Sequence, residues 1–151
     1  MNKLLHVKKT STVKEIFPAV CGTALRRPLF LSGVSAGFPS PADDYLDRKL
    51  DLNEYLVKNP AATFFVRVAG DSMIGAGIND NDILVVDRSL EPCSGNIVIA
   101  VVNGDLTVKR LIRNKTSCRL AAENPDYPDL EITEDTPLEI WGVAAYAIHS
   151  L

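Results

Sequence analysis

The stretch that decides the fold lies at residues 97–112 and reads IVIAVVNGDLTVKRLI. Two runs rich in β-branched residues, 97–102 and 106–112, flank the pair Asn103-Gly104. β-Branched side chains favour strands. A two-residue type I′ turn needs positive φ at both central residues, which asparagine and glycine adopt most easily. The stretch therefore predicts a β-hairpin.

Short runs of the same character fill much of the chain beyond residue 60, and glycine, aspartate and asparagine punctuate them. They lie at residues 64–68, 83–86, 119–120, 130–132 and 138–143. A chain of 151 residues with 46% hydrophobic residues is long enough for one domain with one core. We therefore expect a mainly β fold, built of short, partly closed sheets.

The first forty residues carry no sustained strand or helix pattern and are interrupted by proline and glycine. They predict an extended, poorly ordered N-terminal arm over residues 1–40. A short helical segment is expected next, with Ser40 as its cap, Pro41 in its first turn and Asn59-Pro60 at its end. Its apolar stripe would consist of Leu46, Leu50, Leu52, Tyr55 and Leu56. The alternative is a segment that breaks near Asp51 into two pieces.

The net charge of −3 hides an uneven distribution. Residues 1–36 hold six of the 16 Lys and Arg residues and one of the 19 acidic residues, which gives +5. The remaining residues hold ten basic and 18 acidic side chains, which gives −8. A basic arm joined to an acidic body favours an arm that lies on the body. An arm that binds nucleic acid is the alternative, but the acidic body would repel phosphate.

Cysteine usage and hydropathy limit the classes of protein to which the chain can belong. Cys21, Cys93 and Cys118 have no CxxC or Cys/His spacing, so we expect no disulfide framework, no metal, no cofactor and a reducing cytoplasm. No run of 18 apolar residues exists, which predicts that no helix spans a membrane. Residues 26–36 loosely imitate a secretory signal, but their apolar stretch is short and interrupted, which disfavours export.

Gly70-Asp71-Ser72-Met73 is the first candidate site. It follows a predicted strand, and the glycine lets the chain turn sharply, so that Ser72 can be held on a loop beside outward-facing main-chain N–H groups. An acyl-transfer site needs this combination of an attacking hydroxyl and fixed donors for the oxyanion. The competing interpretation of the tetrapeptide is a turn serine bonded to its own backbone.

A serine nucleophile needs a base, and the histidines are poorly placed for this role. His6 lies in the arm, and His149, at the far end of the sequence, is expected on the surface or at a dimer edge. Lys109 is the alternative, because a lysine within an apolar strand is out of character. Burial would have to lower its pKa from ~10.4 by about 3 units to make it neutral near pH 7. The competing interpretation places Lys109 in solvent beside Arg110, and alternation alone leaves both open.

Several motifs together resemble the catalytic domain of LexA, phage repressors and UmuD. They are Gly70-Asp71-Ser72-Met73, Gly77-Ile78, the run DILVVD at residues 82–87, and TVKRL at residues 107–111. GFPSPA at residues 37–42 and DLNE at residues 51–54 are similar to the UmuD branch, which includes plasmid MucA. The resemblance runs from about Ser35 to Val143.

The resemblance implies a dyad of Ser72 as nucleophile and Lys109 as general base. The main-chain N–H groups of Asp71 and Ser72 would be the oxyanion donors. It also implies that the protein cleaves its own chain at the bond between Ala36 and Gly37. Small residues on both sides would let the peptide enter a narrow cleft, and a glycine permits the distorted backbone that attack requires.

Such a cleavage would divide the chain into a flexible, cleavable N-terminal arm over residues 1–36 and a β-rich serine–lysine peptidase and dimerisation domain over residues 37–151. Cys21–Gly22 is a competing bond of suitable residue types, but it lies far from the Phe38-Pro39 segment. The arm is about a dozen residues longer than in typical UmuD proteins.

The resemblance also implies partners and a pathway. We expect a cytoplasmic homodimer of the SOS response whose cleavage is stimulated by a RecA filament on single-stranded DNA. The processed form would serve as the accessory subunit of an error-prone Y-family polymerase in translesion synthesis. No sequence-specific DNA binding and no membrane contact are expected. The alternatives are a LexA-like transcriptional repressor and a dimeric accessory module that does not cleave.

Overall fold

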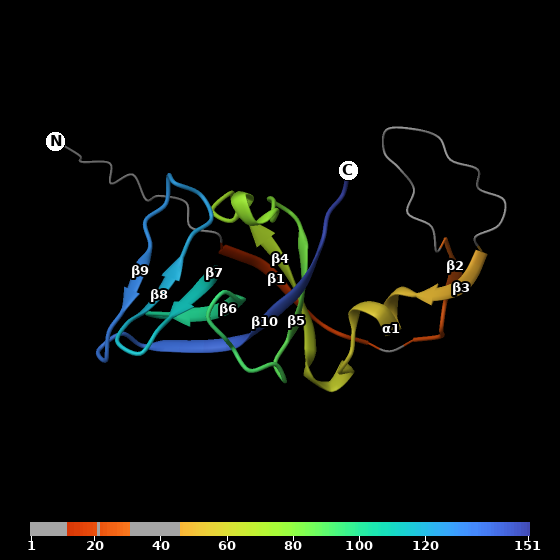
Figure 1. Ribbon diagram of the computed structural model, residues 1–151, viewed down its shortest axis with the longest axis horizontal. Helices are drawn as coiled ribbons and strands as arrows, with labels where there is room; N and C mark the ends of the chain where they lie inside the picture. The colour runs from red at the N-terminus through yellow and green to blue at the C-terminus, as the bar shows by residue number, and fades with distance from the viewer. Residues whose placement is uncertain (1–11, 21, 31–45) are drawn as a thin grey trace.

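The computed structural model describes residues 12–20, 22–30 and 46–151. Strands dominate these ranges, and only short helices join them (Figure 1). In chain order the elements are β1 (Thr12–Pro18), β2 (Arg26–Phe30), β3 (Leu46–Asp51), α1 (Leu52–Leu56), η1 (Pro60–Ala62), β4 (Thr63–Ala69), η2 (Ile74–Ala76), β5 (Ile83–Asp87), β6 (Ile97–Val102), β7 (Asp105–Arg113), β8 (Cys118–Ala121), β9 (Leu130–Ile132) and β10 (Leu138–Ile148). No helix in the described part of the chain is long and apolar enough to cross a membrane.

Eight strands form one curled sheet in the order β1-β4-β5-β10-β6-β7-β8-β9. Neighbouring strands are antiparallel throughout. The sheet curls far enough that Thr12 of β1 also pairs with Thr107 of β7, which confirms the predicted mainly β, partly closed fold. β2 and β3 form a separate two-stranded sheet at the opposite end of the molecule from β8 and β9 (Figure 1).

The predicted hairpin of β6 and β7 is confirmed. Val102 pairs with Asp105, which leaves Asn103 and Gly104 as a two-residue turn. Their φ angles are 50° and 87°, positive at both positions as a type I′ turn requires. The turn fixes the register of β7, and a slip of one residue would move every β7 side chain to the opposite face.

Successive residues of the central strands contribute to two different hydrophobic clusters. On β6, Ile99 belongs to one cluster, whereas Val98 and Ala100 belong to the other. On β7, Val108 belongs to the same cluster as Ile99, and Leu111 belongs to the same cluster as Val98 and Ala100. Burying a Val, Leu or Ile side chain contributes roughly 1.5–3 kcal/mol, so burial on both faces stabilises these strands.

The arm is more structured than the sequence predicted. β1 pairs with β4 from Thr12 opposite Ala69 to Pro18 opposite Phe64, and β2 pairs with β3. The expectation that residues 1–40 hold no strand is therefore wrong for the described part of the arm. The pairing is long-range, and a partner strand supplies hydrogen bonds and packing that local propensity does not register.

The predicted helical segment is also corrected. Its proposed beginning at Ser40 lies outside the described residues, and Leu46–Asp51 forms β3. The helix comprises only Leu52–Leu56, and its N-cap is Asp51, whose carboxylate accepts a hydrogen bond of 2.8 Å from the N–H of Asn53. Pairing with β2 holds residues 46–51 in an extended conformation, although the apolar stripe of the predicted helix includes two of them.

Candidate active site

Ser72 lies on a tight loop that follows β4. The strand ends at Ala69, and Gly70 turns the chain with a φ of 90°, a value that glycine adopts without strain. Its N–H donates to the Asp80 carboxylate at 2.7 Å, which closes the loop at its base. Ser72 is fully buried, with 0% exposure, and so is Met73. The loop therefore presents the serine to the protein interior rather than to solvent.

A second segment, directly after β8, holds this loop in place. The N–H of Glu123 donates to the Ser72 carbonyl at 2.8 Å, and its own carbonyl accepts from the N–H of Gly75 at 2.7 Å. Asn124 donates through Nδ2 to the Asp71 carbonyl at 3.0 Å. The Tyr127 hydroxyl donates to the Asp71 carboxylate, and this hydrogen bond raises the pKa of the tyrosine.

Lys109 reaches the same place from β7. Its side chain is only 5% exposed, and its strand neighbours Val108 and Leu111 are fully buried. Its Nζ donates to the Ser72 Oγ at 3.0 Å, so the structure brings the two predicted residues into direct contact. Desolvation by burial lowers the pKa of Lys109 from 10.5 to about 8.

Arg110 points the other way, as strand alternation requires. Its Nε forms an ion pair with the Glu123 carboxylate, and its guanidinium donates to the Gly95 carbonyl at 2.6 Å. The ambiguity between the two basic residues is thereby settled, since Lys109 is the one that faces inward.

This arrangement has the requirements of a nucleophilic site. A pKa of about 8 leaves roughly a tenth of the Lys109 amines neutral at pH 7, and a neutral amine can take the proton of the contacting hydroxyl. A hollow of about 230 Å³ opens beside Lys109, between the β6–β7 hairpin and the start of β9. Leu106, Thr107, Pro128 and Leu130 are among its lining residues.

The remaining predicted site residues fall into two groups. Asp71 lies on the serine loop, as expected. Ala36 and Gly37 lie outside the described residues, as does the competing residue Cys21. In the described part of the chain, no group of three or more His, Cys, Asp or Glu side chains is placed to hold a metal ion.

His149, which the sequence assigned to the surface or to a dimer edge, contacts a different carboxylate. Its Nδ1 lies 2.8 Å from Asp82, a buried residue that also accepts from the N–H of Asn79 at 2.8 Å. These contacts tie the C-terminal end of β10 to the turn before β5.

Sequence reasoning missed the supporting residues Glu123, Asn124 and Tyr127. Asn124 is 53 residues from Asp71, and Tyr127 is 56. The available signal was the turn sequence Asn124-Pro125-Asp126-Tyr127, in which an asparagine caps a turn and an aromatic hydroxyl follows. That signal predicts a turn but not the loop to which the turn binds.

The chain is similar to known proteins over most of its length. The family model described as Peptidase S24-like matches residues 28–145. Protein MucA of Escherichia coli is 46% identical over 122 residues, which cover 80% of this chain and 83% of MucA. Protein SamA of Salmonella typhimurium is 49% identical over 122 residues, covering 81% of this chain and 84% of SamA. The LexA repressor of Stenotrophomonas maltophilia is 37% identical over 126 residues, covering 83% of this chain and 59% of the repressor.

The resemblance that the sequence motifs carried to the UmuD and MucA proteins is thereby confirmed over four-fifths of the chain. The chain belongs to the Peptidase S24-like family, in its UmuD/MucA branch, and is a LexA/UmuD-type serine peptidase of the SOS response.

Proposed function

We propose that the protein cleaves its own arm between Ala36 and Gly37, with Ser72 as the nucleophile and Lys109 as the general base. The observation that carries this proposal is the 3.0 Å contact between Lys109 Nζ and Ser72 Oγ, made by two buried side chains. Burying an amine is costly, and it makes chemical sense where the neutral form is needed.

The proposed reaction has two stages. Neutral Lys109 takes the proton from Ser72 Oγ while Oγ bonds to the Ala36 carbonyl carbon, and the main-chain N–H groups of Asp71 and Ser72 stabilise the oxyanion. The bond to the nitrogen of Gly37 then breaks, and the Lys109 ammonium returns its proton to that leaving amine. Lys109 then deprotonates a water that attacks the ester carbonyl, and the Lys109 ammonium returns this proton to Ser72 Oγ as the bond to Oγ breaks and the Ala36 carboxylate leaves.

The fate of the products extends the proposal. We infer that residues 1–36 form the removed arm and residues 37–151 the lasting domain. We further infer that the protein is a cytoplasmic homodimer, that RecA filaments on single-stranded DNA stimulate cleavage, and that the processed form serves a Y-family polymerase in translesion synthesis. The similarity to MucA and SamA supports this branch of the family rather than the repressor branch.

The test is self-cleavage of the purified full chain, with activated RecA or at raised pH, followed by mass spectrometry of the products. We expect a fragment that begins at Gly37. Its rate of formation should rise about tenfold for each unit by which the pH is raised, up to about pH 8, because the neutral fraction of Lys109 rises in that proportion. Ser72→Ala, Lys109→Ala and Lys109→Arg proteins should form none, since arginine stays charged.

Ser150→Ala and Lys115→Ala are matched controls at exposed positions and should cleave normally. Cleavage of the Ser72→Ala protein at Gly37 would overturn the proposed mechanism. A wild-type protein that folds but never cleaves would instead indicate an accessory module without peptidase activity.

A further inference from the structure

β1 has an unusual position relative to the proposed cleavage. It belongs to the arm in sequence, yet it is an integral strand of the main sheet, paired with β4 over nearly the whole length of both strands and with β7 at Thr12. Scission after Ala36 would leave β1 attached by non-covalent contacts alone. Once the arm departs, β4 keeps β5 on one side and loses its neighbour on the other.

We propose that this β4 edge is a docking site for an extended segment of a partner protein, covered by β1 until the arm is removed. The segment would add to the sheet as an antiparallel strand with an apolar, a basic and an acidic residue in succession, followed by further apolar residues. This inference rests on the proposed cleavage, because cleavage is what uncovers the edge.

The backbone supplies the first argument. An uncovered edge strand presents a row of unpaired N–H and C=O groups, which pair readily with another extended chain. β4 spans seven residues, longer than a typical edge that proteins leave open. Its side chains Phe64, Val66 and Val68 are buried in the core, so the strand stays in place when its neighbour leaves.

Charged groups beside β4 supply the second argument. Lys14 of β1 contacts Asp80 at 3.2 Å and Asn81 at 2.8 Å, and Glu15 accepts from Arg67 at 2.9 Å. A β-bulge between residues 13 and 15 inserts the lysine as an extra residue and breaks the register there. These contacts specify a basic residue followed by an acidic one.

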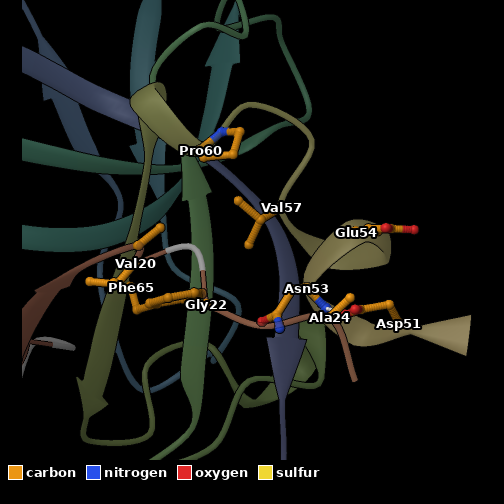
Figure 2. Close-up of a pocket in the computed structure, with 10 residues that line it drawn as sticks. Val20, Gly22, Ala24, Asp51, Asn53, Glu54, Val57, Pro60 and Phe65 are labelled. Carbon is orange, nitrogen blue, oxygen red and sulfur yellow. Dashed lines mark hydrogen bonds between the residues drawn. The ribbon is translucent and has the colours of Figure 1, made fainter. Parts of the chain in front are cut away.

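Apolar surface supplies the third argument. Val13, which precedes the charged pair, packs against the core cluster of β4. Beyond the other end of β1 the arm lines an apolar hollow of about 210 Å³, in which Val20 lies beside Phe65 of β4, with Val57 and Pro60 across from them (Figure 2). The arm contributes part of this lining, including Val20, so departure of the arm opens the hollow next to the vacant edge.

The occupant is a different protein rather than a second processed copy. Two processed copies have both lost β1, so neither can offer the other a strand with this side-chain order. An uncut copy still carries such a strand but keeps it paired with its own β4, so the segment that fits comes from a different protein.

The experiment severs the arm without the peptidase. A full-chain Ser72→Ala protein receives the recognition sequence of an exogenous protease within residues 31–45, is cut, and is freed of the arm fragment by gel filtration. The probe is a fluorescent peptide of residues 12–20, TVKEIFPAV, followed by anisotropy. Failure of self-cleavage cannot affect this result, because Ser72 is absent and the cut is external.

We expect the cut protein to bind the peptide at least tenfold more tightly than the uncut protein. Two further peptides carry N-methyl groups at alternate residues, one at the odd positions and the other at the even positions. One of them should lose binding and the other should bind normally, because only every second N–H of an edge strand faces its neighbour. A Glu15→Arg peptide should bind the cut protein a few-fold more weakly. An Arg67→Glu substitution in the cut protein should restore the affinity for this peptide. Selection from random nonapeptides should recover the order apolar, basic, acidic.

Several outcomes would overturn the proposal. These are equal binding to cut and uncut protein, equal binding of a scrambled peptide, indifference to both N-methylated sets, and pairing of cut copies with each other. Circular dichroism shows whether the cut protein stays folded. If it has unfolded, the same peptides are tested on an uncut Val13→Asp/Glu15→Arg protein, in which the pairing of β1 with β4 is weakened, and the same outcomes support or overturn the proposal.

Discussion

Arg110 and Glu123 form an ion pair that joins the two halves of the active site. Arg110 follows Lys109 on β7, and the main chain of Glu123 binds both Ser72 and Gly75. The strand that carries the amine and the loop that carries the hydroxyl are therefore held through one residue. This explains how a contact between groups 37 residues apart in sequence is kept at hydrogen-bonding distance.

Removing this ion pair should loosen the dyad. Arg110→Ala and Glu123→Ala proteins should each be less stable, and a double-mutant cycle in urea should give a coupling energy of about 1 kcal/mol, because the pair is partly buried. The same cycle on the exposed pair Arg26 and Glu54 should give a coupling energy near zero. Equal coupling energies in the two cycles would contradict the proposed role of Glu123 in joining the Lys109 strand to the Ser72 loop.

The bonds to Asp71 should matter more for cleavage than for folding. Tyr127→Phe removes the hydroxyl that holds the Asp71 carboxylate, and we expect self-cleavage to slow by about three- to tenfold, since a small misplacement of the loop is costly. The melting temperature should change little, because Tyr127 is only half-buried and keeps its ring in the variant. Tyr55→Phe, remote from the loop, is the control, and equal slowing in both proteins would contradict this role.

Asn124→Ala tests the other bond to Asp71. It removes the donor to the Asp71 carbonyl and a cap for the N–H of Asp126. Because Asn124 is buried, we expect a loss of about 1–2 kcal/mol in unfolding free energy together with slower cleavage. An Asn124→Ala protein that unfolds and cleaves like the wild type would show that this side chain does not support the loop.

Gly75 should tolerate no side chain. A Cβ at this position would lie 2.6 Å from the Glu123 carbonyl oxygen, the atom to which the Gly75 N–H donates. Gly75→Ala should therefore cost about 1–3 kcal/mol and slow self-cleavage, as measured by urea denaturation and fragment yield. Gly22→Ala, where a Cβ would meet nothing within 4 Å, should leave stability unchanged.

The buried amine should make stability depend on pH. The folded pKa of Lys109 is about 8 and the unfolded value is near 10.5, so between these values the unfolded chain binds more protons than the folded one. This group therefore lowers stability below pH 8, by up to about 3 kcal/mol, and the loss is recovered as the pH rises to 10.5. Lys109→Met should be more stable than wild type at pH 7, and their difference should shrink toward pH 10.5 in urea titrations.

Much of the fold was predictable because its signals are local. The β6–β7 hairpin is encoded by its own turn and flanking runs, and the buried strands by their composition. β3 was not predictable, because residues 46–51 carry a helical stripe and become a strand only through pairing with β2. β1 was missed for the same reason, since its partner β4 lies some fifty residues away.

The dyad was predictable only in part. Local alternation could not decide between Lys109 and Arg110, and the resemblance of the surrounding motifs to a known family made the choice. The structure assigns the orientation, because Lys109 contacts the buried Ser72 whereas Arg110 pairs with the partly exposed Glu123. The bonds from Asn124 and Tyr127 to Asp71 span more than fifty residues, and no local pattern records a contact at that distance.

The most direct test of the whole account is an NMR titration of the Lys109 side chain in the full-length Ser72→Ala protein, which does not cleave itself. We predict that the ε-carbon of Lys109 and its attached protons titrate with a pKa near 8, below the ordinary lysine value of 10.5. A Lys109 side chain that titrates at the ordinary lysine value would contradict this, because a fully charged amine cannot activate the hydroxyl.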